Sequence, residues 1–364
     1  MKKVLLAIAV IVILTIVGLL VLDNTEEKTV INVGVVGMMS FGSTVGFTHH
    51  QNAMFFLEEH PNTLIRPVAI DDKLDPELSR ELVRQAIEQG TRFFITSHPS
   101  SCALAIMDLF NESKALMLVV SAATPVLSRR DDYILRLCLD TEHEQKMIAQ
   151  LVHAMPGQRL LVLQDDGNLP YTDSAFKTFS QELESLGKWN IVNHKVTVAN
   201  FDPEKMEPLI RGEFDLLYVL AGSYQKTIGN LAQLFHKSHD NIPIILTPWA
   251  YSDGIMEAAG PAVSRIVDYN FRATDSGKEA SQDFIRRLDS RFGQVTPIIS
   301  IGVRKALELL DQAFSKGHRT PEDVKNYLLT VGTHQTTLGK VTLDRFGDMV
   351  LDINTSATTE GQKN

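Results

Sequence analysis

Two polar turns in the first third of the chain carry side chains that could hold a small anion. The turn HPSS follows the apolar segment RFFITS, and the turn SAATP follows the apolar segment LMLVV. Ser101 and Thr124 supply hydroxyl groups there, while Ala122 and Ala123 leave their backbone groups uncovered. Ser100 or Ser101 is placed to cap the helix that starts there. The helix start adds unpaired N–H groups and partial positive charge, which suit a carboxylate. The two turns therefore predict a polar cradle for a small, partly anionic molecule.

A purely structural explanation of these residues stays open, because Ser and Thr after strands most often cap helices and close turns. The position of the turns favours binding. Both follow segments that the pattern predicts to be buried strands, and turns at the carboxyl ends of parallel strands face the ligand crevice of an open sheet. The same argument marks the strand ends at Asp165, Gly222 and Thr247 as places where a ligand is met.

The elements that must position these turns follow one another regularly. From Val30 onward, short apolar segments alternate with amphipathic ones, the pattern of βαβ units in a parallel sheet. Four strand–helix steps precede Asp131, and a second series begins after YILRLCLD. We therefore predict an α/β fold with two doubly wound parallel sheets in tandem. Three late helices between 278 and 332 and a hairpin turning at 345–348 follow, and periodicity does not choose the sheet on which they pack.

Composition narrows the function classes. The 364 residues suffice for two domains, and a hydrophobic content of 44% excludes a largely disordered chain. A formal net charge of −9 without a clustered basic face argues against a nucleic-acid partner. Cys102 and Cys138 are too few for a disulfide scaffold or a metal site. They are expected to be buried free thiols, or to pair if the compartment is oxidising.

The N-terminus predicts an extracytoplasmic protein. Two lysines precede an uninterrupted apolar run over residues 4–22, which reaches the roughly 20 residues that a membrane-spanning helix needs. The lysines keep the N-terminus cytoplasmic. We expect an uncleaved signal anchor with residues from Thr29 onward outside the cytoplasm. A cleaved signal peptide and a secreted protein remain the alternative.

Several catalytic motifs are absent. The glycines near Lys340 lack Walker A spacing, Gly34 and Gly37 do not complete G-x-G-x-x-G, and AGSYQ is not a G-x-S-x-G elbow. We therefore expect no enzymatic activity, no cofactor and no metal.

Further segments resemble a known family. The segments INVGVVG, FGSTVG, NAMFFLEE, SSC, SAATPVL, DDGNLPYTDSAFKTF, TPWAYSDG and LGKVTLDRFGDM occur in this order. Together they resemble the type I periplasmic solute-binding proteins, and within them the branch similar to the leucine/isoleucine/valine-binding protein of ABC transporters. The resemblance extends from about Val30 to Ile353, nearly all of the chain after the apolar run.

The resemblance implies two lobes joined by a hinge of three crossings, which close on a ligand as periplasmic binding proteins do. The resemblance implies residues 29–140 with 272–330 as the first lobe and 141–271 with 331–354 as the second lobe. The sequence itself predicts residues 1–28 as signal anchor and short linker and 355–364 as a disordered tail.

The resemblance also implies a binding site for an amino acid. By position, Ser101 and Thr124 would bind the carboxylate and the carbonyl of Ala122 the ammonium. In the second lobe, Asp253 would pair with the ammonium, where the family has the longer Glu. The remaining positions that the resemblance brings to the cleft are Val45, where the family has an aromatic ring, with Ala123, Tyr171, Ser223, Tyr224 and Trp249.

The function implied is capture of an amino acid or a similar small polar ligand for an ABC-type importer, with a permease as the membrane partner. Because an uncleaved anchor is less usual in a transport receptor, a ligand-sensing subunit with a sensor partner is the alternative. An enzyme on this fold is a third possibility, which requires turnover of the bound compound.

Overall fold

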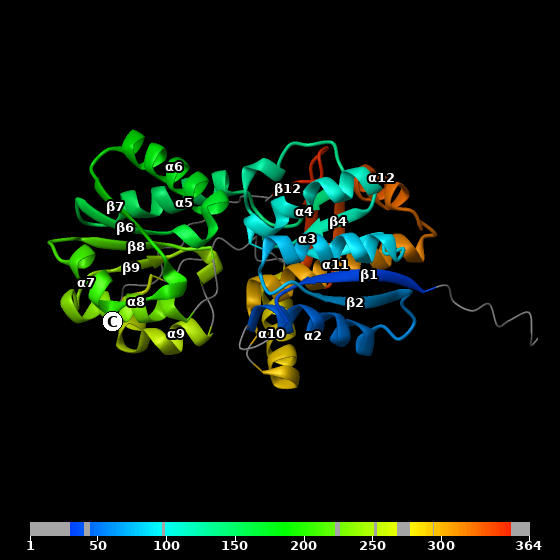
Figure 1. Cartoon of the computed structure of the whole chain (residues 1–364), viewed down its shortest axis with the longest axis horizontal. Coiled ribbons are helices and arrows are strands. Elements are labelled where there is room, and N and C mark those ends of the chain that lie inside the picture. The colour runs from blue at the N-terminus through cyan, green and yellow to red at the C-terminus, as the bar shows by residue number, and fades with distance from the viewer. Residues whose placement is uncertain are drawn as a thin grey trace, which may run out of the picture.

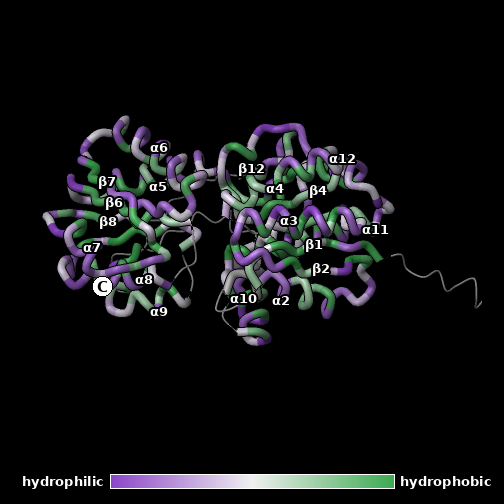
Figure 2. The backbone as a smooth tube through the Cα atoms, in the orientation of Figure 1, coloured by the Kyte–Doolittle hydropathy of each residue, from purple (hydrophilic) through white to green (hydrophobic). Residues whose placement is uncertain are grey.

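The computed structural model describes residues 30–39, 44–96, 99–222, 226–250, 253–267, 277–293 and 295–350. They form two lobes, each built around a parallel sheet, that lie beside each other in Figure 1. The strands are the most hydrophobic segments and lie inside each lobe, while polar residues lie on the outer helices (Figure 2). The predicted α/β fold with two parallel sheets is confirmed.

The first sheet has five parallel strands in the order β2-β1-β3-β4-β5. They are β1 (Ile31–Gly37), β2 (Ile65–Asp71), β3 (Phe93–Thr96), β4 (Leu116–Val119) and β5 (Ile134–Arg136). Apolar residues alternate between two cores, one on each face. One face packs on α3 (Pro76–Glu88) and α4 (Ser100–Ser113), and the other on α2 (Thr44–Glu59), α11 (Pro297–Ser315) and α12 (Pro321–Val331). Beside α2 and α11 lies α10 (Lys278–Phe292).

The second sheet has four parallel strands in the order β7-β6-β8-β9. They are β6 (Arg159–Asp165), β7 (Asn190–Val196), β8 (Leu216–Leu220) and β9 (Ile244–Leu246). One face packs on α5 (Thr141–Ala154) and α6 (Leu169–Leu186), and the other on α7 (Pro203–Ile210), α8 (Thr227–Ser238) and α9 (Asp253–Ala259). The chain enters this lobe between Leu137, which lies in a first-lobe core, and Cys138, which lies in a second-lobe core.

A small antiparallel sheet corrects one prediction. It consists of β10 (Thr333–Thr336), β11 (Gly339–Leu343) and β12 (Met349–Val350), with the predicted hairpin between β11 and β12. We expected residues 331–354 on the second lobe, but this sheet packs on the first. The physical reason is the alternation of Val341 and Leu343, whose side chains join the core beside Leu135. The N–H of Arg136 also donates to the carbonyl of Gly347 at 2.8 Å.

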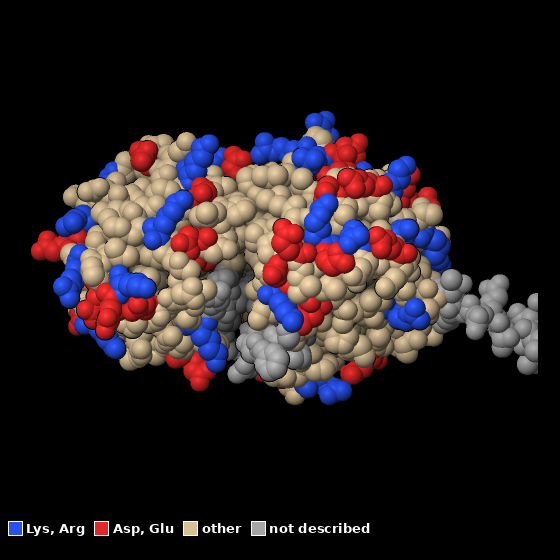
Figure 3. Space-filling view, in the orientation of Figure 1, with Lys and Arg blue, Asp and Glu red and all other residues tan. Residues whose placement is uncertain are grey.

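Charged side chains of both signs are interspersed over the face drawn in Figure 3. Many pair within one helix, as Lys146 does with Glu142 and Arg84 with Glu81. Such exposed pairs contribute little to stability.

Within the described residues, no helix has the length and the hydrophobicity that crossing a membrane requires. The predicted anchor at 4–22 and the predicted tail at 355–364 lie outside those residues.

Candidate functional site

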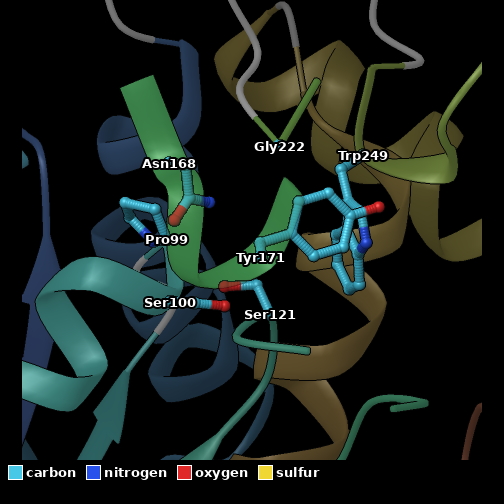
Figure 4. Close-up of a pocket in the computed structure, with 7 residues that line it drawn as sticks. All are labelled: Pro99, Ser100, Ser121, Asn168, Tyr171, Gly222 and Trp249. Atoms are coloured by element: carbon cyan, nitrogen blue, oxygen red, sulfur yellow. The ribbon is translucent and has the colours of Figure 1, made fainter. Parts of the chain in front are cut away.

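A small pocket lies where the two lobes meet, lined by residues from both (Figure 4). Its lining residues are Pro99, Ser100, Ser121, Asn168, Tyr171, Gly222 and Trp249. They follow the carboxyl ends of β3, β4, β6, β8 and β9, the edge where parallel sheets meet ligands. The cavity volume is ≈ 20 Å³, room for about one water molecule. The lobes must therefore move apart before a small molecule can enter.

The first-lobe wall of the pocket is polar. Ser100 begins α4, and no side chain caps the helix start, which corrects the prediction that Ser100 or Ser101 is the cap. The Ser100 hydroxyl oxygen instead accepts a hydrogen bond from the N–H of Thr124 at 3.3 Å. In Figure 4 the hydroxyls of Ser100 and Ser121 lie close to each other at the pocket. This wall combines two hydroxyls with the positive end of a helix.

The side-chain oxygen of Asn168, from the second lobe, accepts a hydrogen bond at the start of α4. The N–H of Ser101 donates to Oδ1 of Asn168 at 3.4 Å, so the two lobes are joined across the pocket. Asn168 precedes α6 and is buried. A ligand carboxylate bound at the start of α4 would take the place of this amide oxygen.

The second-lobe wall is aromatic, and a buried acid lies behind it. The Tyr171 hydroxyl donates to Glu144 Oε1 at 2.5 Å, and Trp249 Nε1 donates to Glu144 Oε2 at 2.8 Å. The side-chain amide of Gln145 donates to Glu144 Oε1 at 2.8 Å. Burial raises the pKa of Glu144 to about 7, although these three hydrogen bonds oppose the shift.

Gly222 completes this wall because it has no side chain. A Cβ at Gly222 would lie 2.7 Å from Cδ1 of Tyr171 and 2.8 Å from Nδ2 of Asn168. Only glycine therefore fits there without displacing the ring or the amide.

The predicted turn SAATP contributes Ser121 to the pocket lining, and not the three residues that we expected there. Ala122, Ala123 and Thr124 are buried and are not among the lining residues. Their carbonyls accept hydrogen bonds from the Cys138 thiol, from Thr141 and from Arg136 respectively. The Thr124 carbonyl accepts from Arg136, and the Thr124 Oγ1 accepts from the N–H of Val126. Both groups therefore take part in hydrogen bonds within the first lobe.

Other predicted residues divide into two groups. The structure brings Tyr171, Trp249 and Gly222 together at the pocket, and Ser101 reaches it through its backbone. Ser223 and Tyr224 lie outside the described residues, as do the side chains of Val45 in α2 and Asp253 at the start of α9.

Three residues of the site escaped the sequence reasoning. Ser121 belongs to the predicted turn SAATP but was not singled out there, and Asn168 follows soon after the strand end at Asp165, so the strand-end argument could have found both. Glu144 also left a signal, because it precedes Ile148 by four residues and Val152 by eight on the buried stripe of α5. A carboxylate on the apolar face of a helix marks a buried polar contact.

Both cysteines are free and buried. Burial raises the pKa of each thiol to about 12, so neither is a thiolate at neutral pH.

Comparison with known proteins gives a family match. A model of the family described as periplasmic binding protein matches residues 61–352, most of the chain. The Leu/Ile/Val-binding protein BraC3 of Rhizobium johnstonii is 25% identical over 178 residues, which cover 48% of this chain and 47% of that protein. The match therefore spans about half the length of this relative.

Solved structures share the fold. A solute-binding protein of an ABC transporter from Rhodopseudomonas palustris BisB5, in complex with 3,4-dihydroxybenzoic acid, has a TM-score of 0.77 at 19% identity, covering 89% of this chain and 91% of that one. The leucine-binding protein LivK from Thermotoga maritima has a TM-score of 0.75 at 17% identity, covering 88% and 93%. At such identities the likeness shows the fold alone.

Proposed function

The chain belongs to the periplasmic binding protein family, and from that premise we propose that it captures a small carboxylic acid between its lobes and delivers it to an ABC-type importer. The proposed ligand class is an amino acid or an aromatic acid. The observation that carries this proposal is the pocket between the lobes, with hydroxyls and a helix start on one wall and aromatic rings on the other.

The two walls suit the two ends of such a ligand. A buried carboxylate must have its charge met by hydrogen bonds, or desolvation defeats binding. Ser100, Ser121 and the N–H of Ser101 can meet it on the first lobe, and the rings of Tyr171 and Trp249 can cover an apolar body on the second. Because the ligand then contacts both lobes, it favours the closed arrangement.

Asp253 decides between the two ligand kinds in this proposal. It begins α9, and in the family its position carries the acid that pairs with an ammonium. An amino acid needs this carboxylate, whereas an aromatic acid without an amine does not.

The membrane context is also part of the proposal. The apolar run at 4–22 anchors an extracytoplasmic protein, which passes its ligand to a permease. That same run favours a second candidate, a membrane-anchored sensor subunit.

A thermal-shift screen against amino acids, benzoates and other small carboxylates tests the proposal. A ligand of the folded form at about 100 times its Kd stabilises by about 2.7 kcal/mol and raises Tm. Calorimetry then compares wild type with Ser121→Ala and Asp253→Ala. Recovery of the ligand unchanged after incubation separates binding from catalysis. The absence of any stabilising carboxylate would contradict the proposed ligand class, and chemical conversion of the ligand would contradict pure binding.

A further inference from the structure

Glu144 is a buried carboxyl group that has no cationic partner among the described residues. Its side chain is buried between α5, α6 and the second sheet, in the core that contains Ile148, Phe179 and Trp249. A buried polar group lowers stability unless it is hydrogen-bonded, and a charged one lowers it more. Among the described residues its hydrogen-bond partners are the neutral donors Tyr171, Trp249 and Gln145.

These contacts use up the donors of the two rings that line the pocket. A tyrosine hydroxyl carries one hydrogen and an indole nitrogen carries one hydrogen. Both hydrogens point to Glu144, at 2.5 Å from the Tyr171 oxygen and 2.8 Å from Trp249 Nε1. Neither ring therefore keeps a donor for a ligand in the pocket.

Ring orientation follows from the same contacts. In Figure 4 the Tyr171 hydroxyl and the Trp249 nitrogen lie on the same side, away from the hydroxyls of Ser100 and Ser121. Gly222 lies against the Tyr171 ring, and even a methyl group there would meet Cδ1 at 2.7 Å. The ring is thus held by a hydrogen bond at its tip and by close packing at its side.

We propose that Glu144 is a positioning residue that sets ligand specificity: it fixes Tyr171 and Trp249 so that the second-lobe wall offers ring faces and no hydrogen-bond donor from either ring. The pocket then selects a carboxylic acid whose body is flat and apolar, because aromatic faces gain most from stacking with another flat ring. This inference rests on the proposed function and narrows its ligand class toward aromatic acids.

Three variants separate positioning from general stability. Glu144→Leu removes both acceptors and keeps an apolar side chain in an apolar core. Glu144→Gln keeps the volume and one acceptor oxygen, so it is expected to show a smaller effect and serves if the leucine variant does not fold. Glu142→Gln, on the same helix but half-exposed and paired with Lys146, is the control.

The first measurement needs no ligand. In a Trp189→Phe background, acrylamide quenching of fluorescence reports the remaining indole, Trp249. We expect the quenching constant of Glu144→Leu to rise about twofold or more while circular dichroism stays native, with Glu142→Gln unchanged. An unchanged quenching constant in folded Glu144→Leu and Glu144→Gln would overturn the positioning role.

The second measurement uses two matched probes, benzoate and cyclohexanecarboxylate, which differ in ring flatness. Calorimetry is expected to show wild type preferring benzoate by about fivefold, the range for an aromatic contact, and Glu144→Leu losing that preference. Equal affinities in wild type would overturn the selection of flat ligands. Failure of wild type to bind either probe would contradict the proposed ligand class and this selection together, while quenching still decides the positioning role.

Discussion

A charged type of side chain is buried in each lobe beside the crossing between the lobes, and the two have different partners. Arg136 in the first lobe is an ion-pair partner of Asp348 at 3.0 Å and of Asp140 at 3.9 Å. Glu144 in the second lobe accepts hydrogen bonds from neutral side chains. Both are almost completely buried.

The pKa values of the carboxyls follow this difference. Burial raises the pKa of Asp140, but hydrogen bonds from His143 and the charge of Arg136 outweigh it, and the pKa lies below its ordinary value. Burial dominates at Glu144 and raises its pKa to about 7. A buried group that is met by opposite charge keeps its ionisation near neutral pH, whereas one met by neutral donors can change its charge there.

We expect the largest loss of stability when the ion pair of Arg136 is removed. Asp348→Ala leaves the Arg136 guanidinium buried with Asp140 only at 3.9 Å, and loss of one partner of a buried pair costs about 3 kcal/mol or more. Urea unfolding measures the loss. The control is Asp131→Ala, whose ion pair with Lys325 is exposed on the aspartate side, so that its free energy of unfolding should change far less. Equal losses in both variants would show that Arg136 does not depend on its ion pair.

We expect Glu144, which has neutral hydrogen-bond partners, to make the free energy of unfolding depend on pH. The pKa of Glu144 is raised in the folded state from 4.5 to about 7, so its contribution to stability is full below about pH 4.5 and is lost as pH rises through about 7. Between about pH 5 and about pH 8, wild type should lose about 2.5 kcal/mol more of its free energy of unfolding than Glu144→Gln. The nearby charge of Asp140 acts in the same direction as burial. Parallel pH profiles of the two proteins would refute this assignment.

Close packing of Gly222 on the Tyr171 ring gives a further test of the contacts around Glu144. Gly222→Ala places a methyl group 2.7 Å from the Tyr171 ring, which must shift away from its position at Glu144. Overpacking of this kind costs about 2 kcal/mol, and ligand affinity should fall with it. Thermal melting is the measurement. Gly254→Ala is the matched control, because the nearest described atoms to its methyl group belong to the flexible side chain of Lys226, and it should be no less stable than wild type. A stable Gly222→Ala with unchanged affinity would show that the ring tolerates displacement.

The smallest effect concerns the contact that joins the two regions. Asn168→Ala removes the 3.4 Å hydrogen bond to the N–H of Ser101, a long bond worth about 0.5 kcal/mol. The ligand-free lobes should then separate more often. Small-angle X-ray scattering is expected to give a larger radius of gyration than for wild type. An identical scattering profile would mean that this bond does not hold the lobes together.

Local pattern alone was enough to predict the two parallel sheets and the edge at which the pocket lies. Alternating apolar segments specify strands and helices within a few residues, and parallel strands bring their carboxyl ends to one edge whatever their sequence. The strand-end argument accordingly marked Gly222, which lines the pocket, whereas Tyr171 and Trp249 were expected there from the family resemblance.

Only the tertiary structure decided which atoms face that pocket. Glu144 meets Trp249 across 105 positions of the chain, a contact that no local period encodes. Thr124 and Ser121 lie in one turn, and the hydrogen bonds of Thr124 with Ser100 and Arg136 leave Ser121 at the pocket. Packing likewise decided that β11 joins the first lobe, because a strand with one apolar face buries it wherever long-range contacts offer a matching core.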